Sequence, residues 1–253
     1  MTQADQGSIK NIVRDHYGSF AEKSRIDATK EQSEAACCAT PKPFYNLEDV
    51  QNLPAESINA SAGCGNPTAI GELQQGETVV DFGSGGGIDC FIAAQAVGRS
   101  GKVVGIDMTT EMIALANENK AKLNLDNVAF HLSEMEHTPL ENNSTDVIIS
   151  NCVINLAPDK NEVFKEAIRI LKPGGRAYIS DMLLVGELPE EAHSDGNWVA
   201  CLSGAEHKDD YIGKMQKAGF VDIEIVSDTP WNGEESWAQR VHSMNIRAYK
   251  AKA

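Results

Sequence analysis

Five of the six cysteines stand outside the expected helices and strands, where a thiol can bind a soft metal or take part in catalysis. Free cysteine is among the most buried residue types, so cysteines in loops need a separate explanation. The sixth, Cys90, has apolar neighbours on a predicted helix and is expected in the core. The candidate functional thiols are Cys37, Cys38, Cys64, Cys152 and Cys201.

A glycine-rich loop at residues 83–87 follows an apolar run and opens a predicted helix. Glycines let the backbone turn tightly and approach a ligand closely. Asp81 beside the loop would repel a pyrophosphate but suits the amino group and sulfonium of S-adenosylmethionine. Asp107 ends the next predicted strand, at a spacing that suits a carboxylate binding ribose hydroxyls. The pattern favours S-adenosylmethionine over a dinucleotide, with contacts from Asp81, Gly83, Ser84, Gly85, Gly87, Asp107 and Met108.

The rest of the nucleoside pocket is expected where the third and fourth strands end. Open α/β sheets bind ligands at the carboxyl ends of their strands. Residues 133–135 follow the third strand, and Glu134 and Met135 are expected to face the adenine. Asn151 and Cys152 follow the fourth strand, next to the expected position of the transferred methyl group.

Short apolar runs alternate with helical segments over residues 71–185, which predicts βαβ units in a mostly parallel sheet. An α/β fold is therefore expected, with seven strands and helices on both faces. The expected helices are 9–20, 88–97, 160–171 and 209–218, with another that begins at Thr109 or Thr110. The expected strands are 78–82, 102–107, 128–132, 146–150, 177–180, 221–226 and 246–249.

The chain is expected to divide into two parts. Residues 1–70 are polar, show no strong strand and are expected to form an N-terminal lid that carries Cys37, Cys38 and Cys64. Residues 71–253 form the expected cofactor-binding domain, with a loop-rich insertion at about 186–208 after the fifth strand.

Charge and composition exclude some classes of function. The formal net charge of −15 argues against nucleic acid or an anionic membrane as partner. No signal peptide and no apolar run long enough to span a membrane is apparent. We therefore expect a cytoplasmic protein whose cysteines are reduced at rest.

The cysteine motifs make the family resemblance specific. The segments 63–67 (GCGNP), 150–156 (SNCVINL) and 201–205 (CLSGA), with the vicinal Cys37-Cys38, resemble the arsenite S-adenosylmethionine methyltransferases. The likeness runs from about Ile12 to about Phe220. It implies a class I (Rossmann-like) methyltransferase fold and methyl transfer to arsenite and methylarsenite, for arsenic detoxification. By the same resemblance, the sequence is expected to be without the longer C-terminal region of many members.

The resemblance also implies roles for the thiols. Cys64, Cys152 and Cys201 would hold As(III), a soft centre that binds three sulfurs and keeps a lone pair at its apex. Methyl transfer yields As(V), and oxidation of two enzyme thiols would return it to As(III). Cys37 or Cys38 would serve in arsenic uptake or in disulfide formation. We expect Cys64 to be the disulfide partner, because an adjacent Cys-Cys disulfide would be strained, and thioredoxin or glutathione would reduce the disulfide.

Two alternatives compete with this interpretation. The acceptor could be another small organic molecule, with a base supplied by one of several histidines. The chain could instead be a metalloid- or metal-binding protein, in which zinc takes three thiolates and a water. The absence of Cys-x-x-Cys spacing and the intact loop from Asp81 to Gly87 count against the second alternative.

Overall fold

The computed structural model describes residues 3–27, 44–233 and 235–252. Its α-helices are α1 (Gln3–Asp27), α2 (Leu47–Val50), α3 (Ala55–Asn59), α4 (Ile88–Val97), α5 (Thr110–Leu123), α6 (Lys160–Ile170), α7 (Asp195–Val199) and α8 (Lys208–Ala218). Its strands are β1 (Thr78–Phe82), β2 (Lys102–Asp107), β3 (Val128–Leu132), β4 (Thr145–Asn151), β5 (Leu171–Leu184), β6 (Phe220–Pro230) and β7 (Val241–Lys250). Four 3-10 turns join them: η1 (Pro67–Ala69), η2 (Ile154–Leu156), η3 (Glu190–Ala192) and η4 (Ala238–Arg240).

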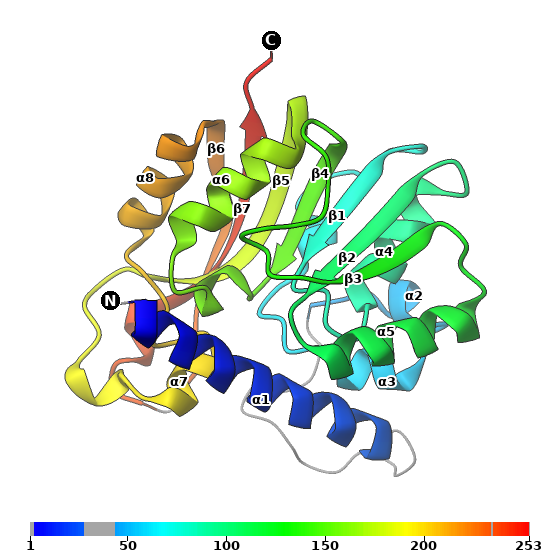
Figure 1. Cartoon of the computed structure of the whole chain (residues 1–253). Coiled ribbons are helices and arrows are strands. Elements are labelled where there is room, and N and C mark those ends of the chain that lie inside the picture. Colours follow the sequence, from blue (N-terminus) through cyan, green and yellow to red (C-terminus); the bar gives the residue numbers. More distant parts are fainter. Residues whose placement is uncertain (1–2, 28–43, 234, 253) are drawn as a thin grey trace.

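The strands form one seven-stranded sheet in the order β3-β2-β1-β4-β5-β7-β6 (Figure 1). Strands β1 to β5 pair in parallel, and β7 runs antiparallel to both β5 and β6. The chain changes direction across the sheet between β1 and β4. At such a switch point, the loops at the carboxyl ends of the strands diverge and leave room for a ligand.

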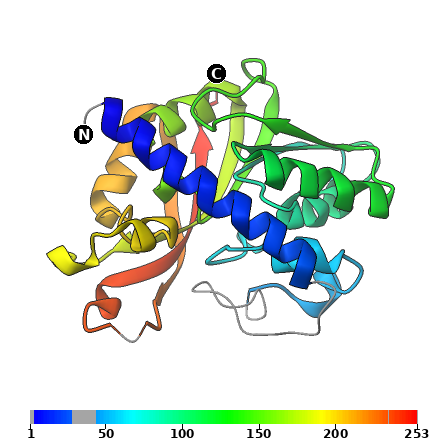
Figure 2. The same cartoon turned by 60° about the horizontal axis from the view of Figure 1, so that its bottom comes forward.

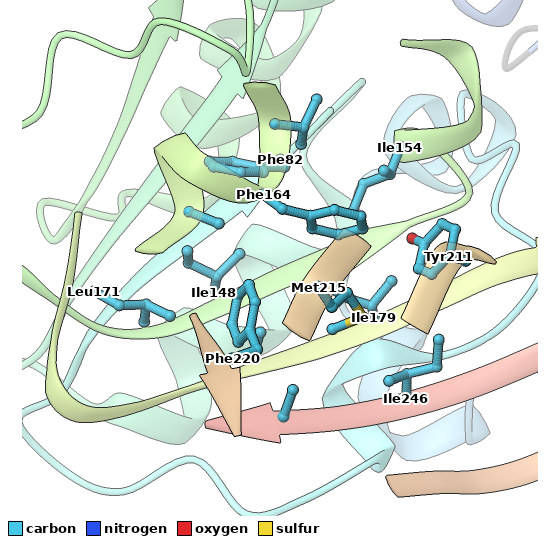
Figure 3. Close-up of a cluster of buried hydrophobic side chains, with 14 of the residues drawn as sticks. Phe82, Ile148, Ile154, Phe164, Leu171, Ile179, Tyr211, Met215, Phe220 and Ile246 are labelled. Atoms are coloured by element: carbon cyan, nitrogen blue, oxygen red, sulfur yellow. The ribbon is translucent and has the colours of Figure 1, made fainter. Parts of the chain in front are cut away.

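Apolar side chains cover both faces of the sheet. On one face, α6 and α8 bring Phe164, Tyr211 and Met215 against Ile148 and Ile179 (Figure 3). On the other face, α4 packs its apolar residues against β1 and β4, together with side chains from the N-terminal segment. Burial on both sides explains why β1 and β4 read as continuous apolar runs.

Helix α1 lies across the end of the sheet at which the parallel strands finish (Figures 1 and 2). It contacts α5 and α3 at one end and α7 at the other. The helix is longer than the expected 9–20. Near its C-terminal end, Arg25 pairs with Glu118 of α5 at 3.0 Å, a contact that an apolar pattern does not reveal. Among the described helices, none combines the length and apolarity needed to cross a membrane.

The sequence predicted β1, β2, β3 and α4 with the bounds that the structure gives them. The expected fifth strand, 177–180, is shorter than β5, which begins at Leu171 rather than Ala177. The Lys-Pro-Gly-Gly turn lies inside this strand as an irregularity, with a shift in its pairing to β4 and a positive φ at Gly174. Strands β6 and β7 also extend beyond the expected bounds and form a long hairpin.

Candidate active site

A cavity lies between α1 and the loops that follow β1 to β4. Its lining comes from the glycine loop, the ends of β2 and β4, the loop after β3, the turn before η1, and one face of α1. Eight of the ten expected cofactor contacts line it: Gly83, Ser84, Gly85, Asp107, Met108, Glu134, Met135 and Asn151.

The glycine loop leaves its backbone open to this cavity. Gly83 and Gly85 have positive φ values of 69° and 49°, which glycine adopts without steric cost. A Cβ at Gly83 would lie 2.3 Å from a methyl group of Val153, so only glycine fits there. The Ser84 hydroxyl oxygen is buried and has no hydrogen-bond partner among the described residues. An unpaired buried hydroxyl beside bare backbone fits a site that a polar ligand completes.

Asp107 is fixed by the backbone around it. Its carboxylate accepts hydrogen bonds from the Gly85 N–H at 2.9 Å and from the Thr109 N–H at 2.8 Å. Burial raises the pKa of this carboxyl, and the backbone hydrogen bonds oppose that rise. A carboxylate held at the end of β2 in this way fits the binding of ribose hydroxyls.

The structure does not bring Asp81 and Gly87 to the cavity wall. Asp81 is buried and accepts a hydrogen bond from the Cys90 thiol at 3.3 Å, and Gly87 caps α4 with a φ of 94°. The carboxyl group that does line the cavity at this point is Asp89, in the first turn of α4. Burial raises the pKa of Asp89 to about 6. The sequence did not single out Asp89, because an acidic residue in the first turn of a helix is already explained by its favourable interaction with the helix dipole.

Asn151 connects the cavity to the Cys64 turn. Its side-chain oxygen accepts hydrogen bonds from the backbone N–H groups of Cys64 and Gly65, at 3.1 and 3.2 Å. Its amide nitrogen donates to the Gly65 carbonyl oxygen, the Tyr45 hydroxyl and the Asp89 carboxylate. The amide therefore fixes the position of Cys64, in addition to lining the cavity.

The loop after β3 is held under α1 by charge. The Lys10 ammonium pairs with Glu134 at 2.7 Å and with Glu136 at 2.8 Å. Arg14 adds a weaker pair to Glu134 and donates a hydrogen bond to the carbonyl oxygen of Met108. The sequence pointed to Glu134 but not to its partner Lys10, which lies 124 residues away, nor to Glu136, because ion pairs between distant segments leave no local pattern.

Three thiols meet at one end of this cavity, and we call Cys64, Cys152 and Cys201 the thiol cluster. The Cys152 thiol lies within hydrogen-bonding reach of both other thiols. The Cys201 thiol also donates to the Cys152 carbonyl oxygen at 2.6 Å. Cys152 itself lines the cavity. The cluster therefore joins the turn before η1, the end of β4 and the insertion after β5 next to the space bounded by the glycine loop.

The cluster is chemically and conformationally unusual. Hydrogen bonds to Cys201 and Cys64, together with burial, raise the pKa of Cys152 well above its ordinary value. Burial raises the pKa of Cys64, while its hydrogen bond to Cys152 opposes the rise. Cys152 and Cys201 have positive φ values of 61° and 62°, a region that residues with a Cβ rarely adopt. Such backbone strain gathers at functional sites, where the surroundings enforce it.

Asp181 lies beside the thiol cluster and is a further residue of the site, to which the sequence did not point. One of its carboxylate oxygens lies, together with the Cys64 and Cys152 sulfurs, in a group whose atoms are all within 4.8 Å of one another. Burial raises its pKa to about 7. The available signal was an acidic residue inside the apolar run of the fifth strand, close to its carboxyl end.

The remaining cysteines divide into two groups. Cys90 lies on α4 and is fully buried in the core, as predicted. Cys37 and Cys38 lie outside the described residues, so their expected role in redox chemistry stays a prediction.

Comparison with known proteins agrees with this geometry. Residues 73–220 match the family model described as a methyltransferase domain. An arsenite methyltransferase from Halobacterium salinarum is 37% identical, over 97% of this chain and 68% of that protein. The chain belongs to the arsenite methyltransferase family. Human arsenite methyltransferase is 34% identical over 90% of this chain, which spans 62% of the length of the human protein.

A solved structure supports the same assignment. The crystal structure of an arsenic(III) S-adenosylmethionine methyltransferase from Chlamydomonas reinhardtii shares 32% identity with this arsenite methyltransferase family member. The two superpose with a TM-score of 0.69, over 83% of this chain and 75% of that one. The predicted Rossmann-like methyltransferase fold is thereby confirmed.

Proposed function

We propose that this protein transfers methyl groups from S-adenosylmethionine to trivalent arsenic, with arsenite and methylarsenite as acceptors. The observation that carries the proposal is the thiol cluster, whose three members come from distant parts of the chain and lie beside a cavity with a glycine loop. Arsenic detoxification in the cytoplasm is the corresponding physiological role.

The residues of the cavity would hold the cofactor, which supplies a methyl group on a sulfonium. Asp107 would accept hydrogen bonds from the ribose, and the glycine loop would let the nucleoside lie against the backbone. Glu134 and Met135 lie next to Lys10 and Arg14 of α1, which would close over the bound nucleoside. Asp89 would offer a negative charge to the cationic part of the ligand.

The thiol cluster would bind the acceptor. As three As–S bonds form, the hydroxyl groups of arsenite leave as water with the three thiol protons. Three sulfurs fill the pyramid of As(III) and leave its lone pair as the nucleophile, so transfer needs no general base. Positioning of two bound reactants can supply roughly 7–11 kcal/mol of the rate enhancement. The strained backbone of Cys152 and Cys201 is consistent with such positioning.

A reductant must complete each cycle. The methyl–arsenic bond takes both electrons of the lone pair, which leaves As(V). Oxidation of two cysteines to a disulfide would return two electrons to arsenic, and thioredoxin or glutathione would reduce that disulfide. We assign Cys37 or Cys38, together with Cys64, to this step. Residues 1–70 would act as a lid on the methyltransferase domain of residues 71–253, with residues 186–208 contributing Cys201.

The test is an assay of the purified chain with arsenite, a thiol reductant and methyl-labelled S-adenosylmethionine. We expect labelled methylarsenicals from the wild type and none from Cys152→Ser, with cofactor binding retained in both. Cys90→Ser serves as the matched control, because Cys90 is a buried thiol that does not line the cavity. Cofactor binding without any methylated arsenic would refute trivalent arsenic as the acceptor. The acceptor would then be an unidentified small molecule.

A further inference from the structure

The thiol cluster has a fourth donor that arsenic does not need. Trivalent arsenic is satisfied by three sulfurs and a lone pair, yet the Asp181 carboxylate lies within 4.8 Å of both the Cys64 and the Cys152 sulfur. The Cys201 thiol lies within hydrogen-bonding reach of Cys152, so a third sulfur stands beside this group of two sulfurs and one oxygen. The donors come from the turn before η1, the loop after β4, the loop after α7, and β5.

Hydrogen bonds hold Asp181 in place, and no cation among the described residues forms an ion pair with it. It is 0% exposed and accepts hydrogen bonds from the Tyr211 hydroxyl and the Met182 N–H, both at 3.0 Å. Tyr211 is itself fixed by a ring contact with Phe164 inside the apolar cluster (Figure 3). Lys160 acts on Asp181 electrostatically, but its ion pair at 3.6 Å is with Glu206. Buried carboxylates are normally paired or bound to a metal.

The donor set selects one class of ion. Three thiolates exclude Mg²⁺ and Ca²⁺, which take oxygen ligands. Soft or borderline divalent ions prefer thiolates and, unlike As(III), take four donors in a tetrahedron. An ideal zinc site has Zn–S bonds of about 2.3 Å and donor–donor edges of roughly 3.8 Å. The Cys64 sulfur, the Cys152 sulfur and an Asp181 oxygen are separated by no more than 4.8 Å and reach that geometry through small side-chain movements. The Cys201 thiol lies outside that group but within hydrogen-bonding reach of Cys152, so its side chain would turn toward the other three donors.

We infer that Cys64, Cys152, Cys201 and Asp181 form a four-coordinate site for Cd²⁺ or Zn²⁺. Binding would replace the three thiol protons and any proton on the Asp181 carboxyl, all of which leave to the solvent, with no change of oxidation state. The metal site depends on the donors alone. Its consequence, that the ion competes with arsenite for the same thiols, rests on the proposed function.

The experiment uses the full-length, reduced protein titrated with CdCl₂. Ultraviolet absorption from sulfur-to-cadmium charge transfer gives the stoichiometry, and ¹¹³Cd NMR reports the number of sulfur and oxygen ligands. We expect one bound ion per chain with a chemical shift typical of three sulfurs and one oxygen. Cys152→Ser should move the shift toward fewer sulfurs and weaken binding at least tenfold.

Asp181→Asn isolates the fourth donor. We expect its ¹¹³Cd shift to differ from that of the wild type, and its affinity for Cd²⁺ to fall at least tenfold more than its affinity for arsenite, measured by arsenic–thiolate absorption. Asp209→Asn, an exposed change on α8, is the matched control and should bind Cd²⁺ like the wild type. Circular dichroism of each variant verifies that it is folded, and the wild-type NMR shift tests the ligand set without any substitution.

The outcomes separate the two proposals. A wild-type shift without an oxygen ligand, or one unchanged in a folded Asp181→Asn, overturns the four-donor site. Arsenite binding without Cd²⁺ binding overturns the metal site and leaves the methyltransferase proposal standing. Failure of both ligands to bind overturns the metal site and removes the thiol cluster as the arsenic site as well.

Discussion

At the scale of single residues, backbone strain distinguishes the site cysteines Cys152 and Cys201 from the core cysteine Cys90. Cys201 has a φ of 62°, where a Cβ costs roughly 1–2 kcal/mol, whereas Cys90 lies in helix α4. We expect Cys201→Gly to be more stable than Cys201→Ala by about 1 kcal/mol. The order should reverse at Cys90, where glycine costs about 1 kcal/mol relative to alanine. Urea unfolding of the four variants measures this, and the same order at both positions would contradict strain at Cys201.

Asp89 gives a pH dependence at the same scale. Burial raises its pKa to about 6 from 3.8, so between these values the folded protein binds more protons than the unfolded chain. Its contribution to stability therefore falls as pH rises from about 4 to 6 and stays constant above. The total is up to about 3 kcal/mol at 1.36 kcal/mol per unit. Relative to Asp89→Asn, the wild type should lose stability over this window in urea unfolding. Asp126 is exposed, so the stability of Asp126→Asn should vary with pH as that of the wild type does. If the stability of Asp89→Asn also varied in parallel with that of the wild type, Asp89 would not be the source of this pH dependence.

At the scale of elements, the central strands could be predicted and the assembly of the site only in part. Strands β1 and β2 are buried on both faces, so their apolar runs define them, and the glycine loop follows from its position between β1 and α4. The three thiols were identified through motifs rather than through geometry. The places of Asp181, Asp89 and the partners of Asn151 in the site depend on contacts between distant segments. No periodic pattern of neighbouring residues encodes such contacts.

The loop that carries Cys201 offers a test with glycine substitutions. A Cβ at Gly204 would lie 2.1 Å from the backbone oxygen of Asn155, so Gly204→Ala must displace the loop. We expect arsenite binding to weaken at least tenfold, while affinity for S-adenosylmethionine changes less than twofold. Gly213→Ala on α8 meets no atom within 4 Å and should stabilise the protein by about 0.5–1 kcal/mol. Arsenic–thiolate absorption and urea unfolding measure both effects, and unchanged arsenite binding in Gly204→Ala would show that the loop adapts.

At the scale of the whole molecule, α1 connects the two halves of the site. Its Lys10 pairs with Glu134 and Glu136 beside the cavity, and its Tyr17 hydroxyl donates to the carbonyl oxygen of Val199, next to the Cys201 loop. One helix therefore contacts both the cofactor side and the thiol side. Loosening it should change the residence time of the cofactor more than the chemistry of the thiols.

Lys10→Met tests whether α1 acts as a lid. Exposed ion pairs contribute about 0.2–1 kcal/mol, and the pair to the buried Glu136 should contribute at the upper end, so we expect S-adenosylmethionine to dissociate about fivefold faster. Because salt screens such pairs, raising the ionic strength should accelerate dissociation from the wild type and have little effect on the variant. Arg25→Met removes a pair to Glu118 at the far end of α1, away from the cavity lining, and should leave the rate unchanged. Stopped-flow displacement measures all three rates. Equal rates in Lys10→Met and the wild type would mean that closure of the site comes from elsewhere, since the ion pairs that hold α1 over the cavity would then contribute nothing to retention.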